Sequence, residues 1–138
     1  MGKPKATILC IDDDSTVLET CKELLEIGGY EVLAAQSGVQ GLGLFVSHPI
    51  DAVVLDYKVP GMNGDRVARQ MRRVKPDVLI LMLSGYTELP LNELGCVDAF
   101  LHKGESWSTV LSTLDQLLNP HVPFFVRWWE DWKHRLSG

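Results

Sequence analysis

The sequence has few cysteines and no long hydrophobic run, and each absence excludes a class of protein. Its three cysteines (Cys10, Cys21 and Cys96) form no C-x-x-C pair and no spacing typical of a metal site. We interpret them as buried free thiols of a reducing compartment. No apolar stretch approaches the length of a membrane span, and the apolar run that ends at Asp12 is too short for a signal peptide. We therefore expect a cytoplasmic protein and do not expect a membrane among its main partners.

An excess of positive charge is also missing. The 138 residues carry a formal net charge of −5 at pH 7, which argues against a nucleic-acid binder. We interpret the arginines between residues 66 and 73 as a solvated helix face. The four histidines are scattered and predict no metal site. A chain of this length holds one domain with a real core, or one domain and a tail.

Apolar stretches alternate with helical patterns along the first 118 residues. The stretches are continuous, which is typical of strands buried on both faces of a parallel sheet. They span residues 6–11, 30–35, 50–55, 77–83 and 97–101. Five alternations of strand and helix predict a doubly wound α/β fold with a parallel sheet. The strand–helix pattern is weakest over residues 86–95, where Pro90 leaves few residues for a helix.

The expected helices carry their own start and stop signals. Thr16 and Glu19 fit a capping box for the first helix, and Gly28-Gly29 ends it. Ser37 opens the second helix, and the last spans residues 106–118. The periodicity predicts inward-facing apolar residues in the second and third helices. These are Leu42, Phe45 and Val46 in the second helix, and Val67, Met71 and Val74 in the third.

Polar residues follow four of the expected strands. The acidic run Asp12–Asp14 follows the first, Asp56 the third, Ser84 the fourth and Lys103 the fifth. The carboxyl ends of parallel strands share one crevice, in which ligands bind. Clustered carboxylates need a cation, and Mg²⁺ prefers such oxygen ligands. A hydroxyl and a lysine opposite that ion suit a phosphoryl group, so the sequence predicts a phosphoryl-transfer site.

Four motifs in this order resemble the receiver domain of two-component response regulators. They are IDDD at 11–14, LDYKVPGMNG at 55–64, LSG at 83–85 and FLHKG at 100–104. The resemblance covers residues 6–118 and implies a flavodoxin-like fold. It implies that Asp56 is the phosphoacceptor. It also implies a Mg²⁺ site formed by Asp12, Asp13, Asp56 and the backbone carbonyl of Lys58.

The resemblance assigns three further residues. Ser84 would hydrogen-bond one phosphoryl oxygen, and Lys103 would pair with another. Phe100 matches the aromatic switch residue, which turns inward when Ser84 is drawn toward the phosphate. The chain departs from the family at Gly104, where a proline in a cis turn normally follows the lysine. The short segment around Pro90 predicts a fourth helix that is truncated or absent.

The chain beyond residue 118 has a different composition. Residues 119–138 read as a Pro-containing linker followed by an aromatic amphipathic helix, with Trp128, Trp129 and Trp132 on its apolar side. Three interpretations stay open for this tail. It folds back on its own domain, it binds a partner or a second copy of the chain, or it lies on a membrane surface.

The leading functional interpretation is a phosphoacceptor switch, which is not an enzyme in the ordinary sense. It would receive phosphoryl from a sensor histidine kinase or a phosphotransfer protein, and its output would be protein–protein contact. One alternative is a phosphorylation-independent interaction module with the same fold. Another is a phosphatase of the haloacid dehalogenase type, with Asp12 as nucleophile and Asp14 as acid/base.

Overall fold

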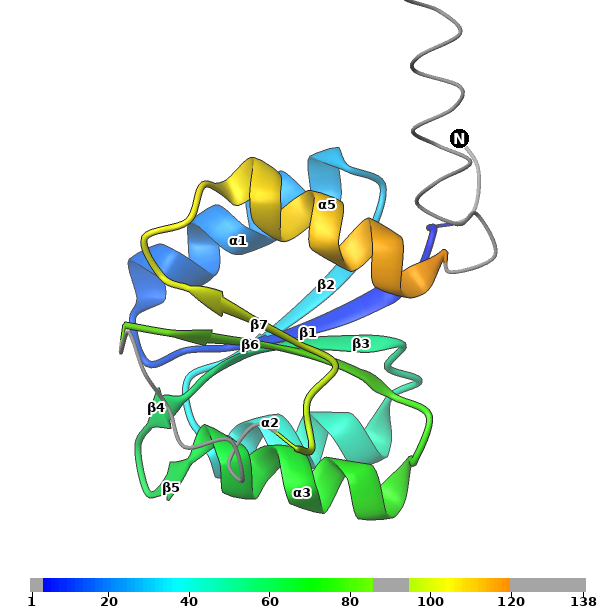
Figure 1. The fold of residues 1–138 in the computed structure, drawn as a ribbon. Helices are drawn as coiled ribbons and strands as arrows, with labels where there is room; N and C mark the ends of the chain where they lie inside the picture. Colours follow the sequence, from blue (N-terminus) through cyan, green and yellow to red (C-terminus); the bar gives the residue numbers. More distant parts are fainter. Residues whose placement is uncertain (1–3, 86–94, 120–138) are drawn as a thin grey trace, which may run out of the picture.

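Five parallel strands form a central sheet in the order β2-β1-β3-β6-β7 in the computed structural model, which describes residues 4–85 and 95–119 (Figure 1). The strands are β1 (Thr7–Ile11), β2 (Glu31–Ala35), β3 (Ala52–Asp56), β6 (Leu79–Ser84) and β7 (Ala99–His102). Each begins and ends within two residues of an expected apolar stretch. The predicted doubly wound α/β fold is confirmed.

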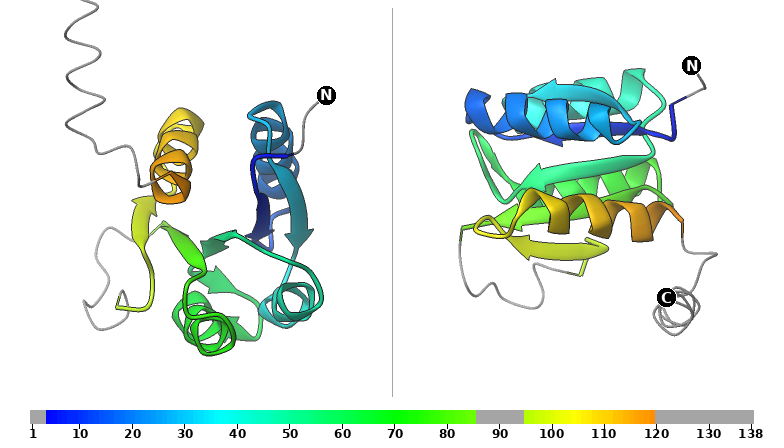
Figure 2. Two further views of the ribbon diagram at one scale, coloured as in Figure 1. Left: turned by 90° about the vertical axis from the view of Figure 1, so that its right-hand side faces the viewer. Right: turned by 90° about the horizontal axis from the view of Figure 1, so that it is seen from above.

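Helices cover both faces of this sheet. They are α1 (Ser15–Ile27), α2 (Gly38–Ser47), α3 (Gly64–Val74) and α5 (Trp107–Leu118). The pair α1 and α5 lies on one face and the pair α2 and α3 on the other, which gives three layers (Figure 2). A short antiparallel hairpin of β4 (Lys58–Val59) and β5 (Met62–Asn63) lies between β3 and α3. The predicted tail helix with Trp128, Trp129 and Trp132 lies outside the described residues, as does the segment 86–94.

The continuous apolar strands supply two cores, one on each side of the sheet. Alternate residues of one strand point to opposite faces. In β1, Ile8 and Cys10 pack toward α1 and α5, whereas Leu9 and Ile11 pack toward α2 and α3. All four side chains are buried. This two-sided burial explains why the strands read as unbroken apolar runs, and it fixes the register of each strand.

Two glycines in α2 allow that helix to pack closely, at the expense of helix propensity. A Cβ atom at Gly41 would overlap the side chain of Ile11. A Cβ atom at Gly38 would lie 2.9 Å from Cγ2 of Val67 in α3. This glycine-rich helix is therefore held by contact with β1 and α3.

The structure corrects three local predictions about the helices. The cap of α1 is Asp14, whose carboxylate accepts hydrogen bonds from the amides of Thr16 and Val17, so the predicted capping box at Thr16 is wrong. Val46 and Val74 do not face the core: 63% and 59% of their surfaces are exposed. Both lie in the last turn of a helix.

One cysteine and one arginine also differ from expectation. Cys10 and Cys21 are buried with their Sγ atoms 3.0 Å apart, as free thiols, but Cys96 is only half-buried. Arg72 is not part of a solvated face. Its guanidinium donates to the carbonyls of Val78, Cys96 (2.9 Å) and Pro76, and pairs with Asp98 at 2.8 Å, as described below.

The contacts of Arg72 join α3 to the start of two neighbouring strands. Its partner Asp98 also accepts a hydrogen bond from the amide of Ile80 in β6 at 2.8 Å. The amide of Asp98 in turn donates to the carbonyl of Ile80 at 2.8 Å. One side chain of α3 therefore fixes the entry into β7 against β6.

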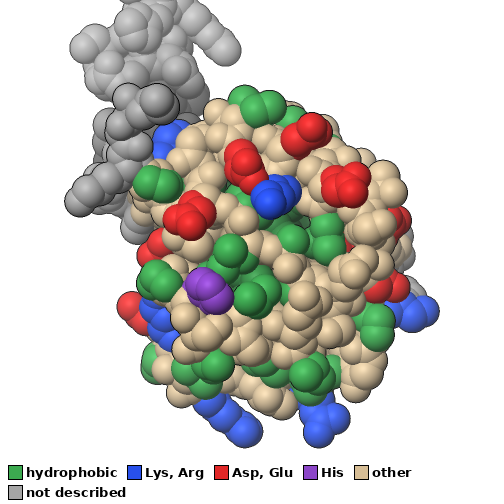
Figure 3. All heavy atoms as spheres, turned by 180° about the vertical axis from the view of Figure 1, so that it is seen from behind, with side chains coloured by type: hydrophobic (Ala, Val, Ile, Leu, Met, Phe, Trp, Pro, Cys, Tyr) green, Lys and Arg blue, Asp and Glu red, His purple; other side chains and the backbone are tan. Residues whose placement is uncertain are grey.

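Some large hydrophobic side chains remain on the surface. The most exposed are Ile27, Val39, Val46 and Val74. The face of the molecule at the β2 edge shows hydrophobic side chains interspersed with acidic and basic ones (Figure 3). Among the described residues, no helix has both the length and the apolar character that a membrane crossing needs.

Candidate functional site

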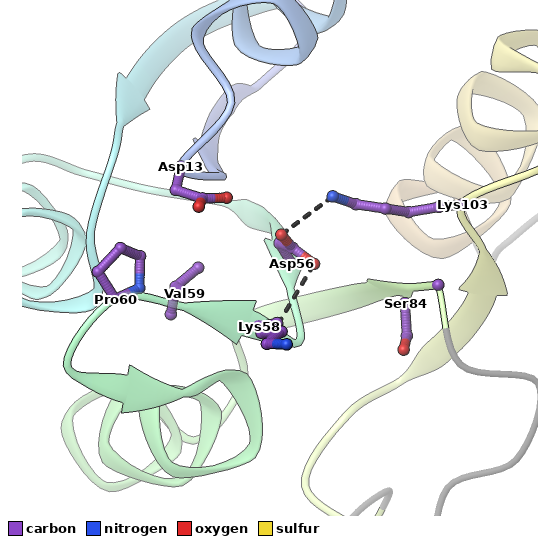
Figure 4. Close-up of a pocket in the computed structure, with 8 residues that line it drawn as sticks. Asp13, Asp56, Lys58, Val59, Pro60, Ser84 and Lys103 are labelled. Carbon is purple, nitrogen blue, oxygen red and sulfur yellow. Dashed lines mark hydrogen bonds and ion pairs between the residues drawn. The ribbon is translucent and has the colours of Figure 1, made fainter.

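The carboxyl ends of four strands meet around one open pocket of about 640 Å³. It is lined by Asp13, Asp56, Lys58, Val59, Pro60, Ser84, Gly85 and Lys103 (Figure 4). The predicted site residues from four separate places in the sequence are thus brought together. The parallel sheet accounts for this, because every strand of such a sheet delivers its last residues to the same edge.

Three carboxylates converge at this edge. Oxygen atoms of Asp12, Asp13 and Asp56 all lie within 4.8 Å of one another. Asp12 and Asp56 are each only 4% exposed, whereas Asp13 faces the solvent. Clustered carboxylate oxygens with one open side fit a hard divalent cation such as Mg²⁺, which usually keeps some water ligands.

Lys103 bridges two of these acids. Its Nζ lies 3.0 Å from a carboxylate oxygen of Asp12 and 3.0 Å from one of Asp56. Burial by itself would lower the pKa of Lys103, but its hydrogen bonds to Asp56 and Asp12 outweigh burial, and the pKa is raised. The ammonium therefore stays charged and partly compensates the buried acids.

Asp56 occupies the centre of the pocket. Burial raises the pKa of its carboxyl group, the hydrogen bond from Lys103 lowers it, and the charge of Asp12 raises it again, with a net upward shift. The amide of Lys58 also donates to Asp56, at 3.3 Å. A carboxylate whose charge is disfavoured by burial attracts a cation or an electrophile.

The turn after β1 is shaped by its own acids. The amide of Asp14 donates to Asp12 at 3.0 Å, and the Asp14 carboxylate caps α1. Asp14 is thereby used as a helix cap, which orients Asp12 and Asp13 toward the pocket. The acid/base role that the phosphatase interpretation gives to Asp14 has no support in this geometry.

Ser84 lines the pocket at the end of β6. It is only 1% exposed, and its hydroxyl is directed away from the Lys103 ammonium (Figure 4). Phe100 pairs with Met82 of β6 from its place in β7, is half-buried and packs against the core beneath α2 and α3. The two predicted switch residues therefore lie on neighbouring strands, and Ser84 is the one of the two that lines the pocket.

Two residues that shape this site, Gly64 and His102, were not predicted from the sequence. Gly64 begins α3 directly beneath Asp56, where a Cβ atom would lie 2.7 Å from the Asp56 carbonyl oxygen and 2.7 Å from Cα of Tyr57. The last glycine of LDYKVPGMNG was the available signal. His102 makes hydrogen bonds to both neighbouring turns, and its position beside the unusual Gly104 was the available signal.

The family model for the response regulator receiver domain matches residues 8–103. The response regulator MprA of Mycobacterium sp. (strain KMS) is 34% identical over 119 residues, which are 84% of this chain and 52% of that protein. MprA from Mycobacterium avium (strain 104) is 33% identical over the same length. The chain spans about half the length of the curated relatives it matches.

Solved structures agree with these sequence relatives. A receiver domain from Clostridium thermocellum is 32% identical, with a TM-score of 0.78, over 84% of this chain and 96% of that one. TrrA from Thermotoga maritima, solved with Mg²⁺ and BeF, is 30% identical with a TM-score of 0.77, over 81% and 98%. Receiver domains bind Mg²⁺ at an acidic pocket and are phosphorylated by histidine kinases. The chain belongs to the response regulator receiver domain family, the phosphoacceptor switches of two-component signalling.

Proposed function

We propose that Asp56 is the residue of this receiver that accepts the phosphoryl group. The observation that carries the proposal is the position of its carboxylate at the centre of the pocket, 3.0 Å from Nζ of Lys103 and within 4.8 Å of the Asp12 and Asp13 oxygens. One oxygen of Asp56 attacks phosphorus as the bond from phosphorus to its donor atom breaks. The donor keeps that electron pair and takes up a proton.

Asp12, Asp13 and Asp56, with the backbone carbonyl of Lys58, would hold Mg²⁺ in this pocket. The ion supplies positive charge for the phosphoryl oxygens when bound. The fit rests on the chemistry of the donors, which are all oxygen, and on the exposed side at Asp13. Two of the three acids are nearly fully buried, so an uncompensated cluster would be strongly unfavourable.

Lys103 and Ser84 complete the phosphoryl site in this proposal. The Lys103 ammonium would pair with one phosphoryl oxygen after leaving part of its contact with Asp56. The Ser84 hydroxyl would turn from its present direction toward another oxygen. Movement of Ser84 would make room for Phe100, which is half-buried here, to turn inward.

The phosphoryl donor is proposed to be the phosphohistidine of a sensor kinase or a phosphotransfer protein. Output is proposed to occur by protein–protein contact, with Trp128, Trp129 and Trp132 of the tail as contact residues for a partner or a second copy of the chain. A truncated chain that ends at residue 118 tests whether the tail mediates self-association. Sedimentation velocity with and without phosphorylation should show self-association in the full chain and none in the shortened one.

Intact mass after incubation with acetyl phosphate and Mg²⁺ tests the phosphoacceptor. We expect one added phosphoryl group, which Asp56→Asn or chelation of the metal removes. An unmodified wild-type chain would favour the interaction module. Phosphate release that persists in Asp56→Asn would favour chemistry at Asp12 instead.

A further inference from the structure

One imidazole connects the turns that follow β6 and β7. His102 is the last residue of β7 and pairs in register with Ser84, the last residue of β6. Its Nε2 lies 3.2 Å from the carbonyl oxygen of Gly85, and its Nδ1 lies 2.9 Å from the amide nitrogen of Gly104. Gly85 directly follows Ser84, and Gly104 directly follows Lys103. The ring therefore links the two turns that carry the phosphoryl-binding side chains.

The partners of the ring determine its protonation state. The amide of Gly104 can only donate, so Nδ1 of His102 must be unprotonated. The carbonyl of Gly85 can only accept, so Nε2 must carry the proton. The neutral tautomer with Nε2–H satisfies both bonds. A protonated ring would oppose an N–H group to the Gly104 amide and lose that bond.

The surroundings of the ring are otherwise simple. In the described part of the chain, the charged residues that line the groove beside His102 are Lys103 and Glu105. The backbone closes the same turn through two further bonds. The amide of Lys103 donates to the Ser84 carbonyl at 2.8 Å, and the amide of Glu105 donates to the His102 carbonyl at 3.0 Å. The imidazole adds the bond to Gly104, which lies between these two amides.

Gly104 fits the imidazole through its lack of a side chain. A Cβ atom at this position would lie 2.9 Å from Nδ1 and 3.3 Å from Cε1 of His102. Any larger residue would push the ring away from the amide that it holds. The peptide bond from Lys103 to Gly104 is trans. The histidine and the glycine therefore act as a matched pair at the point where the resemblance leads one to expect a proline.

We propose that His102 is a positioning residue for Lys103: its neutral imidazole holds the Lys103–Gly104 turn against the Ser84–Gly85 turn, so that the ammonium reaches Asp12 and Asp56. The kinetic consequence rests on the proposed function of the pocket, because Lys103 acts there on the phosphoryl group. The hydrogen-bonded link between the turns does not depend on that function.

Two substitutions separate the hydrogen bonds of the ring from its size. His102→Leu replaces the ring by an apolar side chain of similar size that makes neither hydrogen bond. In His102→Gln, the side-chain amide can still accept a hydrogen bond from the Gly104 amide or donate one to the Gly85 carbonyl. The rate constant for uptake of phosphoryl from acetyl phosphate, at saturating Mg²⁺, should fall about tenfold in the leucine variant. The glutamine variant should recover most of the rate. Equal rates in wild type and His102→Leu would overturn the proposal.

Repeating the His102→Leu change in a Lys103→Ala variant shows whether the loss of rate depends on Lys103. In Lys103→Ala, the additional change His102→Leu should cause no further loss, because the residue that it positions is already gone. An equal loss in both backgrounds would contradict a positioning role.

NMR spectroscopy tests the hydrogen bonds of His102 directly, without any phosphorylation. Long-range ¹H–¹⁵N spectra of the imidazole should show the Nε2–H tautomer at pH 8, and the Gly104 amide should exchange more slowly in wild type than in His102→Leu. A wild-type chain that takes up no phosphoryl would refute the proposed function. The tautomer spectrum and the exchange rate of the Gly104 amide would still test the hydrogen-bonded link made by His102. A proton on Nδ1, or unchanged exchange at Gly104, would overturn it.

Discussion

The two turns that bring charge to the pocket are held by different chemistry. After β1, the turn is closed by its own acids, since Asp12 accepts from the Asp14 amide and Asp14 caps α1. After β7, the turn is held by the imidazole of His102, which contacts Gly104 and Gly85. The first turn is thus held by bonds within one loop, whereas the second depends on one side chain that joins two separate loops.

This difference divides the pocket into a fixed half and an adjustable half. The fixed half carries Asp12, Asp13 and Asp56, the groups proposed to bind the metal and accept the phosphoryl. The adjustable half carries Ser84 and Lys103, the groups proposed to respond to it. A switch needs both, because the acceptor must be preorganised while the responding residues must move. The predictions below test each half.

The largest effect is expected in the fixed half, at Gly64. In Gly64→Ala, the new Cβ would lie 2.7 Å from the backbone of Asp56 and Tyr57, which cannot move without shifting the acceptor. We expect a loss of about 3 kcal/mol in the free energy of unfolding, measured by urea denaturation. Gly43→Ala is the control, because a Cβ there meets nothing within 4 Å and should stabilise α2. Similar effects in both variants would contradict this description of the fixed half.

The strands that carry Ser84 and precede Lys103 should be destabilised at their other ends, away from the pocket, in Arg72→Met. The substitution leaves the carbonyls of Val78 and Cys96 and the carboxylate of Asp98 without their guanidinium donor. We expect a loss of about 2 kcal/mol in the free energy of unfolding. Arg72→Lys should recover little, because a single ammonium cannot reach all of these acceptors. Full recovery by lysine would show that charge alone matters here.

Mg²⁺ affinity should respond differently to the loss of two neighbouring acids, Asp13 and Asp14. Asp13→Asn removes a carboxylate of the three-acid cluster, and we expect Mg²⁺ affinity to fall at least about tenfold, or roughly 1.4 kcal/mol, by titration calorimetry. Asp14→Asn removes the same charge one residue later while retaining a good helix cap. It should change Mg²⁺ affinity far less. Equal losses would mean that net charge, and not the position of the ligand, controls binding.

The smallest effect is expected away from both turns, at Tyr30, which precedes β2. Its hydroxyl lies 3.4 Å from Asp115 of α5, and burial, then the charge of Asp115, raises the pKa of Tyr30. The unfolded chain therefore loses the phenol proton at a lower pH than the folded chain, so stability falls as the pH rises above about 10. Tyr30→Phe should cost about 1 kcal/mol at neutral pH and show a weaker alkaline decline. An identical decline in thermal melts would exclude this contribution.

Much of the fold follows from the sequence because its strands are buried on both sides. Such strands appear as unbroken apolar runs, and their ends mark where Asp56, Ser84 and Lys103 meet. The cap of α1 could not be assigned in the same way, because three consecutive acids and Thr16 all offer a capping oxygen. Helical periodicity also failed at Val46 and Val74, since periodicity does not tell how far along a helix burial extends.

The long-range side-chain contacts could not be predicted from the sequence for a different reason. Arg72 reaches Cys96 and Asp98, which lie 24 and 26 residues away, and only the packing of α3 beside β7 brings them together. His102 bonds to Gly85, 17 residues away. Local patterns report which residues are apolar or can cap a helix. They do not report which backbone carbonyl a long side chain will reach.

The position of the phosphoryl group tests the central claim most directly. The chain is incubated with acetyl phosphate and Mg²⁺ and treated with borohydride, which reduces an acyl phosphate and leaves homoserine in place of aspartate. Peptide mass spectrometry then locates the homoserine. We predict homoserine at position 56 alone, and its absence when the metal is chelated. Homoserine at position 12, or at no position in a chain that has gained phosphoryl mass, would contradict the account.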